Sequence, residues 1–209
     1  MVEIRNLVHS YQQRAVLNIA KLDILPNSSW LILGNSGSGK TTLLHIIAGL
    51  LPYQQGSVKV LDTELNTLTS RQLDRFRAKN IGLVFQKSHH IGTLTVLENV
   101  LLAQYALGIK QNKTKCLALL EQLQISHLAK QYPAQLSQGE AQRLSIARAV
   151  INEPKLILAD EPTASLDDTN AQIVANLLFT HAQAHQATLV VATHDQRLKP
   201  LFEHLWKIN

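Results

Sequence analysis

The feature that most constrains this chain is residues 34–42, which read Gly-Asn-Ser-Gly-Ser-Gly-Lys-Thr-Thr. They fit G-x-x-x-x-G-K-[ST], a loop whose backbone N–H groups surround the phosphates of a nucleoside triphosphate. Apolar runs at residues 30–33 and 43–48 flank it. This order predicts a strand, a phosphate loop and a helix whose N-terminus points at the phosphates. The predicted nucleotide-binding residues are Gly34, Asn35, Ser36, Gly37, Ser38, Gly39, Lys40, Thr41 and Thr42.

Length and composition limit the class of protein. The 209 residues, 45% of them hydrophobic, predict one domain covering residues 1–209. No apolar run approaches the ~18 residues of a membrane helix, and the N-terminus has no apolar signal region, so we expect a cytoplasmic protein. Its charge of +5 is spread along the chain and only 5% of residues are aromatic, so we expect no nucleic-acid partner. The one cysteine, Cys116, excludes an internal disulfide and lies among leucines, which predicts a buried helix position.

Apolar spacing along the chain predicts the secondary structure. The predicted strands are residues 2–11, 16–25, 30–33, 57–61, 81–85, 156–159 and 188–192. The predicted helices are residues 43–48 and 70–79, a helical stretch from about 93 to 132, and a helix through residue 150 that Ser137 caps. The early strands suggest a small β layer. The continuous apolar strands, separated by helices, predict a parallel sheet buried on both faces.

Polar residues follow several of these strands, where parallel sheets collect their ligands. They are Gly34, Gln86, Asp160, Glu161 and His194. Transfer of a phosphoryl group to water needs charge neutralisation, a metal ion and an oriented nucleophile. Lys40 can reach the β- and γ-phosphates, and the Thr41 hydroxyl and Asp160 can hold Mg²⁺. Glu161 can act as general base on the attacking water, and His194 can donate a hydrogen bond to the γ-phosphate.

For four other histidines, a structural role is preferred over a metal-ligand role. His181 and His185 lie four residues apart on a predicted helix and could share a metal ion. No third ligand accompanies them in the sequence, so an ordinary helix face is the preferred interpretation. For His89 and His90, which follow Gln86, a loop role is preferred over a ligand role.

Together these residues resemble the nucleotide-binding subunits of ABC transporters over essentially the whole chain. Residues 136–140, Leu-Ser-Gln-Gly-Glu, look like the signature motif of that family. Gln86 looks like its Q-loop glutamine, and residues 164–167, Ala-Ser-Leu-Asp, look like its D-loop, with Asp167 at the end. His194 looks like its switch histidine, and Tyr11 sits where the family has an aromatic residue that stacks on adenine.

The resemblance implies an α/β fold: a P-loop NTPase core with a mostly parallel sheet, an N-terminal antiparallel β subdomain and a helical signature-motif subdomain at about residues 88–150. It implies ATP and Mg²⁺ as cofactors, with Gln86 joining Thr41 and Asp160 at the metal. Two such domains would pack head to tail, so that one subunit's signature segment completes the ATP site of the other. The signature residues concerned are Ser137, Gln138, Gly139 and Glu140.

The implied partners are a second nucleotide-binding subunit, identical or different, and an integral membrane permease on whose cytoplasmic side the chain would bind. Residues 81–86 and 94–100 resemble the lipoprotein-releasing, macrolide-efflux and cell-division subgroup. Export, import and force transmission across the membrane stay open, as does an ATP-gated regulatory scaffold. The chain ends at Asn209, so we expect it to lack the C-terminal regulatory domain of many importer ATPases. The commonest signature has Gly third and Gln fifth, and the effect of Gln138 and Glu140 on turnover is an open question.

Overall fold

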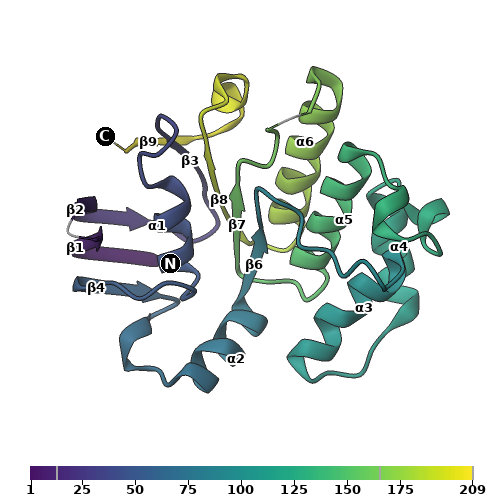
Figure 1. Cartoon of the computed structure of the whole chain (residues 1–209), viewed down its shortest axis with the longest axis horizontal. Coiled ribbons are helices and arrows are strands. Elements are labelled where there is room, and N and C mark those ends of the chain that lie inside the picture. Colours follow the sequence, from purple (N-terminus) through teal and green to yellow (C-terminus); the bar gives the residue numbers. More distant parts are fainter. Residues whose placement is uncertain (13, 165, 209) are drawn as a thin grey trace.

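Two sheets and the helices around them form the chain, which is represented here by a computed structural model describing residues 1–12, 14–164 and 166–208 (Figure 1). One sheet has four strands in the order β2-β1-β4-β5, and the other has five in the order β6-β7-β8-β3-β9. Every strand pairing of the first sheet is antiparallel and every pairing of the second is parallel. This arrangement confirms the predicted α/β fold class.

The antiparallel sheet consists of β1 (Val2–Tyr11), β2 (Arg14–Ile24), β4 (Gln55–Val60) and β5 (Thr63–Glu64). It lies on the far side of helix α1 (Lys40–Ile47) from the parallel sheet (Figure 1). Its inward side chains join the buried α1 leucines and isoleucines in one hydrophobic cluster. The sheet therefore supports the helix that begins at the phosphate loop.

The parallel sheet consists of β3 (Ser29–Leu33), β6 (Ile81–Val84), β7 (Leu156–Asp160), β8 (Thr188–Thr193) and β9 (His204–Lys207). Every residue of β7 and β8 is buried, as expected for central strands covered on both faces. The sequence pattern missed β9, whose residues are half-buried or exposed because it forms an edge of the sheet beside β3.

The larger helices are α2 (Ser70–Asn80), α3 (Val96–Leu107), α4 (Lys113–Gln122), α5 (Gln138–Val150) and α6 (Asp168–Ala184). Short 3₁₀ turns occupy Leu65–Thr67, Ser126–Leu128, Pro133–Gln135 and Gln196–Leu201. The helical stretch expected at about 93–132 is interrupted, because Gly108 at φ 76° ends α3 in a left-handed conformation and Asn112 caps a new helix. None of the described helices is long and apolar enough to cross a bilayer.

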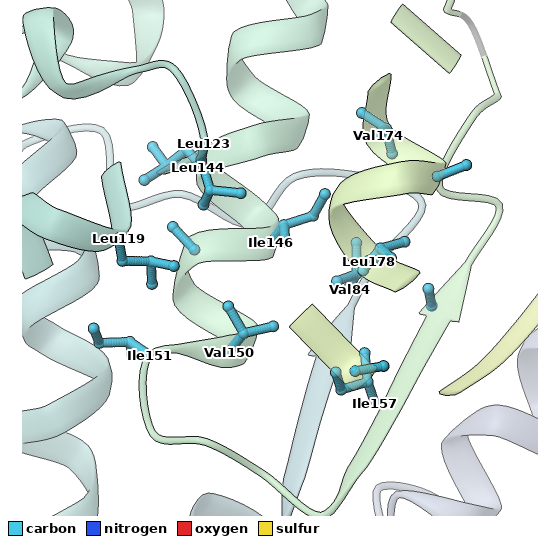
Figure 2. Packing of buried hydrophobic residues seen from close by; sticks show 14 of the residues in the cluster. Val84, Leu119, Leu123, Leu144, Ile146, Val150, Ile151, Ile157, Val174 and Leu178 are labelled. Atoms are coloured by element: carbon cyan, nitrogen blue, oxygen red, sulfur yellow. The ribbon is translucent and has the colours of Figure 1, made fainter. Parts of the chain in front are cut away.

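Helix α5 joins the helical region to the sheet. Its apolar side chains belong to one buried cluster with residues of α4, α6, β6 and β7 (Figure 2). Cys116 is fully buried on α4 within this cluster, as predicted. The packed position of α5 fixes where its N-terminus, the predicted signature segment, is presented. The members of the buried cluster that Figure 2 labels are Val84, Leu119, Leu123, Leu144, Ile146, Val150, Ile151, Ile157, Val174 and Leu178.

Candidate active site

The phosphate loop connects β3 to α1 through a backbone that requires glycine. Gly37 and Gly39 have φ of 78° and 96°, in the left-handed region that other residues avoid. A Cβ atom on Gly34 would lie 2.3 Å from the Ser38 hydroxyl oxygen. Gly39 is the N-cap of α1, and no side-chain hydrogen bond from the described residues caps this helix. Its first N–H groups are thus free to bind an anion.

Lys40 is buried and lies across the loop. Its Nζ atom donates to the carbonyl oxygens of Gly34 and Asn35 at 2.9 and 3.0 Å. The same atom is 3.4 Å from Oε1 of Glu161, and both side chains are less than 8% exposed. The charge of Lys40 therefore lies between the phosphate loop and Glu161, where the terminal phosphate of a bound nucleotide would need it.

Thr41 and Asp160 form the best candidate for a metal site. The Thr41 hydroxyl donates to Oδ2 of Asp160 at 2.7 Å across 119 residues of sequence. Oδ1 of Asp160 is buried without a hydrogen-bond partner in the part of the chain that the structure describes. Burial raises the pKa of this carboxyl group, and the Thr41 hydrogen bond opposes that shift. A buried free carboxylate oxygen beside a hydroxyl oxygen is a donor set that fits Mg²⁺.

Glu161 begins the turn after β7 and is held by the end of β8. Its Oε2 accepts from the Thr193 hydroxyl at 2.6 Å and from the His194 backbone N–H at 3.3 Å, and its Oε1 is 3.0 Å from Nδ1 of His194. Burial alone would raise the pKa of Glu161, but hydrogen bonds from His194 and Thr193 outweigh it, so the pKa is lowered. Glu161 also has φ 47°, an uncommon conformation for a non-glycine residue that clusters at functional sites. The side chain is therefore a fixed, ionised proton acceptor.

The remaining predicted residues lie around this cluster. Gln86 lies two residues beyond β6 with an exposed side chain, and no hydrogen bond joins it to Thr41 or Asp160 among the described residues. Tyr11 ends β1, half-exposed, with its ring edge-on to His9 at 4.8 Å. Asp167 is the N-cap of α6 and accepts from the Asn170 backbone N–H. Ser165 of the predicted D-loop lies outside the described residues.

The signature segment forms a capping box at the N-terminus of α5. The Ser137 side chain accepts from the backbone N–H of Glu140, and the carboxylate of Glu140 accepts from the Ser137 N–H and hydroxyl, each at 2.8 Å. The predicted capping role of Ser137 is confirmed. Hydrogen bonding from the Ser137 backbone lowers the pKa of Glu140. Within the described ranges, no hydrogen bond joins this segment to the phosphate loop of the same chain.

Three of the histidines for which the sequence favours no metal-ligand role make local contacts. His90 contacts the Ser145 hydroxyl through Nε2 at 2.9 Å, and burial lowers its pKa to about 4. The ring of His181 on α6 stacks at 4.3 Å on that of His185, the C-cap of this helix, and His185 lies 4.0 Å from a carboxylate oxygen of Glu153. Across residues 1–12, 14–164 and 166–208, no group of three His, Cys, Asp or Glu side chains is placed to hold a metal ion.

Some contributors to this geometry escaped sequence analysis. No motif described above includes Thr193, yet its hydroxyl donates to Glu161 and positions it. Thr163 and Arg197 contact Asp195, beside His194, and neither matches the motifs considered above. No sequence signal identified them, because their contacts depend on how the turns after β7 and β8 meet.

Comparison with known proteins decides the family. Residues 17–164 match the family model described as ABC transporter. The chain belongs to the ABC transporter family. The family resemblance read from the motifs is thereby confirmed, and the protein is an ABC-type ATPase subunit.

The chain is also similar to individual members of this family. The chain is 42% identical over 180 residues to the lipoprotein-releasing system ATP-binding protein LolD of Treponema pallidum (strain Nichols), covering 85% of this chain and 80% of the relative. It is 38% identical over 199 residues to LolD of Blochmanniella floridana, covering 92% and 85%. A solved dimer of the ATP-binding cassette MJ0796, in a post-hydrolysis state with ADP and Pi, superimposes with a TM-score of 0.93 at 33% identity, covering all of this chain and 94% of that one.

Proposed function

We propose that this subunit hydrolyses ATP as one of a pair of cassettes, and that the pair drives a membrane complex of the lipoprotein-releasing type. The observation that carries the proposal is one cluster at the carboxyl end of the parallel sheet. There Thr41 contacts Asp160 at 2.7 Å, and Glu161 contacts His194 at 3.0 Å and Lys40 at 3.4 Å. These are the groups that phosphoryl transfer to water needs.

In this proposal the phosphate loop binds the triphosphate through its backbone N–H groups, and Lys40 neutralises the β- and γ-phosphates. Glu161 accepts the proton of a water whose oxygen attacks the γ-phosphorus, while the bond to the β-phosphate oxygen breaks to give ADP and phosphate. His194 donates to the γ-phosphate from its exposed side chain. Thr41 and Asp160, with Gln86, would hold Mg²⁺, which when bound supplies positive charge to the phosphates.

A second cassette, identical or related, would complete each site. The signature residues Ser137, Gln138, Gly139 and Glu140 form the first turn of α5 and its cap. A helix N-terminus presented to a neighbouring subunit is suited to bind the γ-phosphate held there. The dimeric state of the MJ0796 cassette supports this arrangement. Tyr11 would stack on the adenine, and Asp167 would face the partner subunit.

The permease would dock beside the Q-loop, which would place the subunit on the cytoplasmic membrane face. A cleft of about 200 Å³ lies between β6, α3 and α5, lined by Phe85, Lys87, His89, Ala106 and Arg148 among others. Because Phe85 and Lys87, the two neighbours of Gln86 in the chain, line this cleft, movement of the Q-loop would change its shape. The LolD relatives favour a permease of the lipoprotein-releasing type over an importer permease or a regulatory scaffold.

The Glu161→Gln variant tests the hydrolytic half of the proposal. The amide keeps the shape of the side chain and removes the proton acceptor, so we expect ATP binding with a turnover loss of roughly 10²–10⁴-fold. The variant should then accumulate as an ATP-bound dimer on a sizing column. Glu203→Gln, a change of the same kind at an exposed position, serves as control. Unchanged turnover in Glu161→Gln would refute the base assignment, and absence of hydrolysis by the unaltered protein would refute the function.

Subunit mixing tests the head-to-tail pair. Lys40→Ala destroys only the phosphate-loop half of a site, and Ser137→Arg only the signature half. A mixed dimer contains one site in which both halves are intact, so mixing the two inactive variants should restore part of the activity. No recovery on mixing would refute the composite site. The type of membrane partner is tested by purifying the tagged subunit with its permease from native membranes: a permease of few spanning helices and a large external domain is expected, and an importer permease would refute the assignment.

A further inference from the structure

The carboxylate of Asp195, next to His194, accepts hydrogen bonds on both of its oxygen atoms. The Arg197 guanidinium meets it as a fork, with Nε 2.9 Å from Oδ1 and Nη2 2.7 Å from Oδ2. The Arg197 backbone N–H donates to Oδ1 at 3.0 Å, and the Thr163 hydroxyl donates to Oδ2 at 2.8 Å. The fork lowers the pKa of Asp195 to about 2. This side chain, only 12% exposed, is therefore a fixed anion joining the turns after β7 and β8.

The remaining guanidinium nitrogen extends the connection to α6. Nη1 of Arg197 forms an ion pair with Asp168, the first residue of that helix. The preceding residue is Asp167, the cap of α6 and the residue that the D-loop resemblance directs at the partner subunit. Arg197 thus contacts both the His194 turn and the segment expected at the dimer interface.

The other end of the connection reaches the general base. The backbone N–H of Asp195 donates to the Thr193 hydroxyl at 2.9 Å, and that hydroxyl donates to Glu161 at 2.6 Å. His194, between Thr193 and Asp195, is therefore flanked by two residues whose side chains are already fixed. A continuous set of hydrogen bonds runs from Glu161 through Thr193, Asp195 and Arg197 to Asp168.

We propose that Arg197 is a positioning residue. Through its contacts with Asp195 and Asp168 it fixes the positions of His194 and Glu161 relative to the N-terminus of α6. The inference rests on the proposed ATP hydrolysis and adds to it a residue outside the recognised motifs. The Arg197 side chain is 45% exposed and that of Asp168 is 90% exposed, so the Arg197–Asp168 ion pair contributes little to folding stability. What they supply is geometry: the fork fixes two oxygens of Asp195 at once, which a lysine ammonium cannot reproduce.

The test compares Arg197→Gln, Arg197→Lys and Asp168→Asn with a control, Lys199→Gln. Lys199 is exposed in the same 3₁₀ turn, and it forms no ion pair within the part of the chain that the structure describes. Purified full-length variants are assayed for kcat, KM for ATP, binding of a fluorescent ATP analogue, and thermal unfolding. A misplaced catalytic group lowers the rate by roughly ten- to a hundredfold without changing ground-state binding.

We expect both Arg197 variants to lose kcat to that extent, with KM, nucleotide affinity and melting temperature close to those of the parent. Asp168→Asn should lose less of its kcat, because Arg197 keeps its contact with Asp195. Lys199→Gln should have the kcat of the parent. The inference would be overturned by a parental kcat in Arg197→Gln or in Arg197→Lys. It would also be overturned if the loss of kcat only paralleled a loss of folded protein in the thermal unfolding measurement. Failure of the proposed function would instead appear as absence of hydrolysis in the unaltered chain.

Discussion

Glu140 places a carboxylate in the signature segment, at the helix end that the proposed dimer directs at the partner's γ-phosphate. Hydrogen bonds from Ser137 lower the pKa of Glu140, so the group is ionised at neutral pH. A helix N-terminus carries about half a positive charge, and one carboxylate in the first turn more than cancels it. We therefore predict that Glu140→Gln strengthens the ATP-bound dimer. A glutamine can still accept from Ser137 in the capping box, so the helix should stay capped.

The size of the effect follows from the charge removed. A charge in the first turn of a helix is worth about 0.3–1 kcal/mol at an exposed position, and the dimer contains two such sites. The sum of about 0.6–2 kcal/mol corresponds to a dimer dissociation constant lowered roughly three- to thirtyfold. Because the interaction is between exposed charges, it should shrink as the salt concentration rises.

The assay is sedimentation of Glu161→Gln and of the Glu140→Gln/Glu161→Gln double variant with saturating ATP, since the loss of Glu161 should slow hydrolysis enough to keep ATP bound. The chain offers a matched control in Glu98, which accepts from Thr95 in the same capping-box geometry at the start of α3. Glu98→Gln removes the same charge from an equivalent cap on another helix. Equal dimer affinities for the Glu140 and Glu98 variants, or a salt-independent difference, would refute the reasoning.

Three further predictions concern binding, packing and pH. Lys40→Ala should abolish hydrolysis and weaken binding of a fluorescent ATP analogue, because the buried ammonium is the main cation at the loop; affinity equal to that of the parent would contradict its role. Gly82→Ala should lower the free energy of unfolding by about 1–3 kcal/mol in urea, since the new Cβ would lie 2.3 Å from the Ala149 carbonyl oxygen, whereas Gly92→Ala, with open space around it, should not. Burial lowers the pKa of folded His90 to about 4, so the unfolded chain takes up its proton first, and the free energy of unfolding should fall from about pH 6.5 to 4; His90→Gln should show a shallower fall, and an identical pH profile would count against this.

Most elements of the fold could be predicted because their signals are local. The helix at residues 70–79 agrees with α2 to within one residue, since Thr69 and Gln72 form a capping box at its start. The buried strands β7 and β8 were recognised from continuous apolar runs. Strand β9 was missed because it is only four residues long and none of its residues is fully buried. The break between α3 and α4 was missed because a single glycine, Gly108, decides it.

The candidate site divides in the same way. The sequence by itself determined the phosphate loop, the acidic pair after an apolar strand, and the serine that caps the signature helix, because each depends on residues that are neighbours in the chain. Only the tertiary structure decided that Thr41 meets Asp160, that Lys40 meets Glu161, and that Arg197 links the ends of two strands to α6. These contacts depend on the order of strands in the sheet and on how the turns pack, which are set by the burial of the whole core rather than by any local pattern.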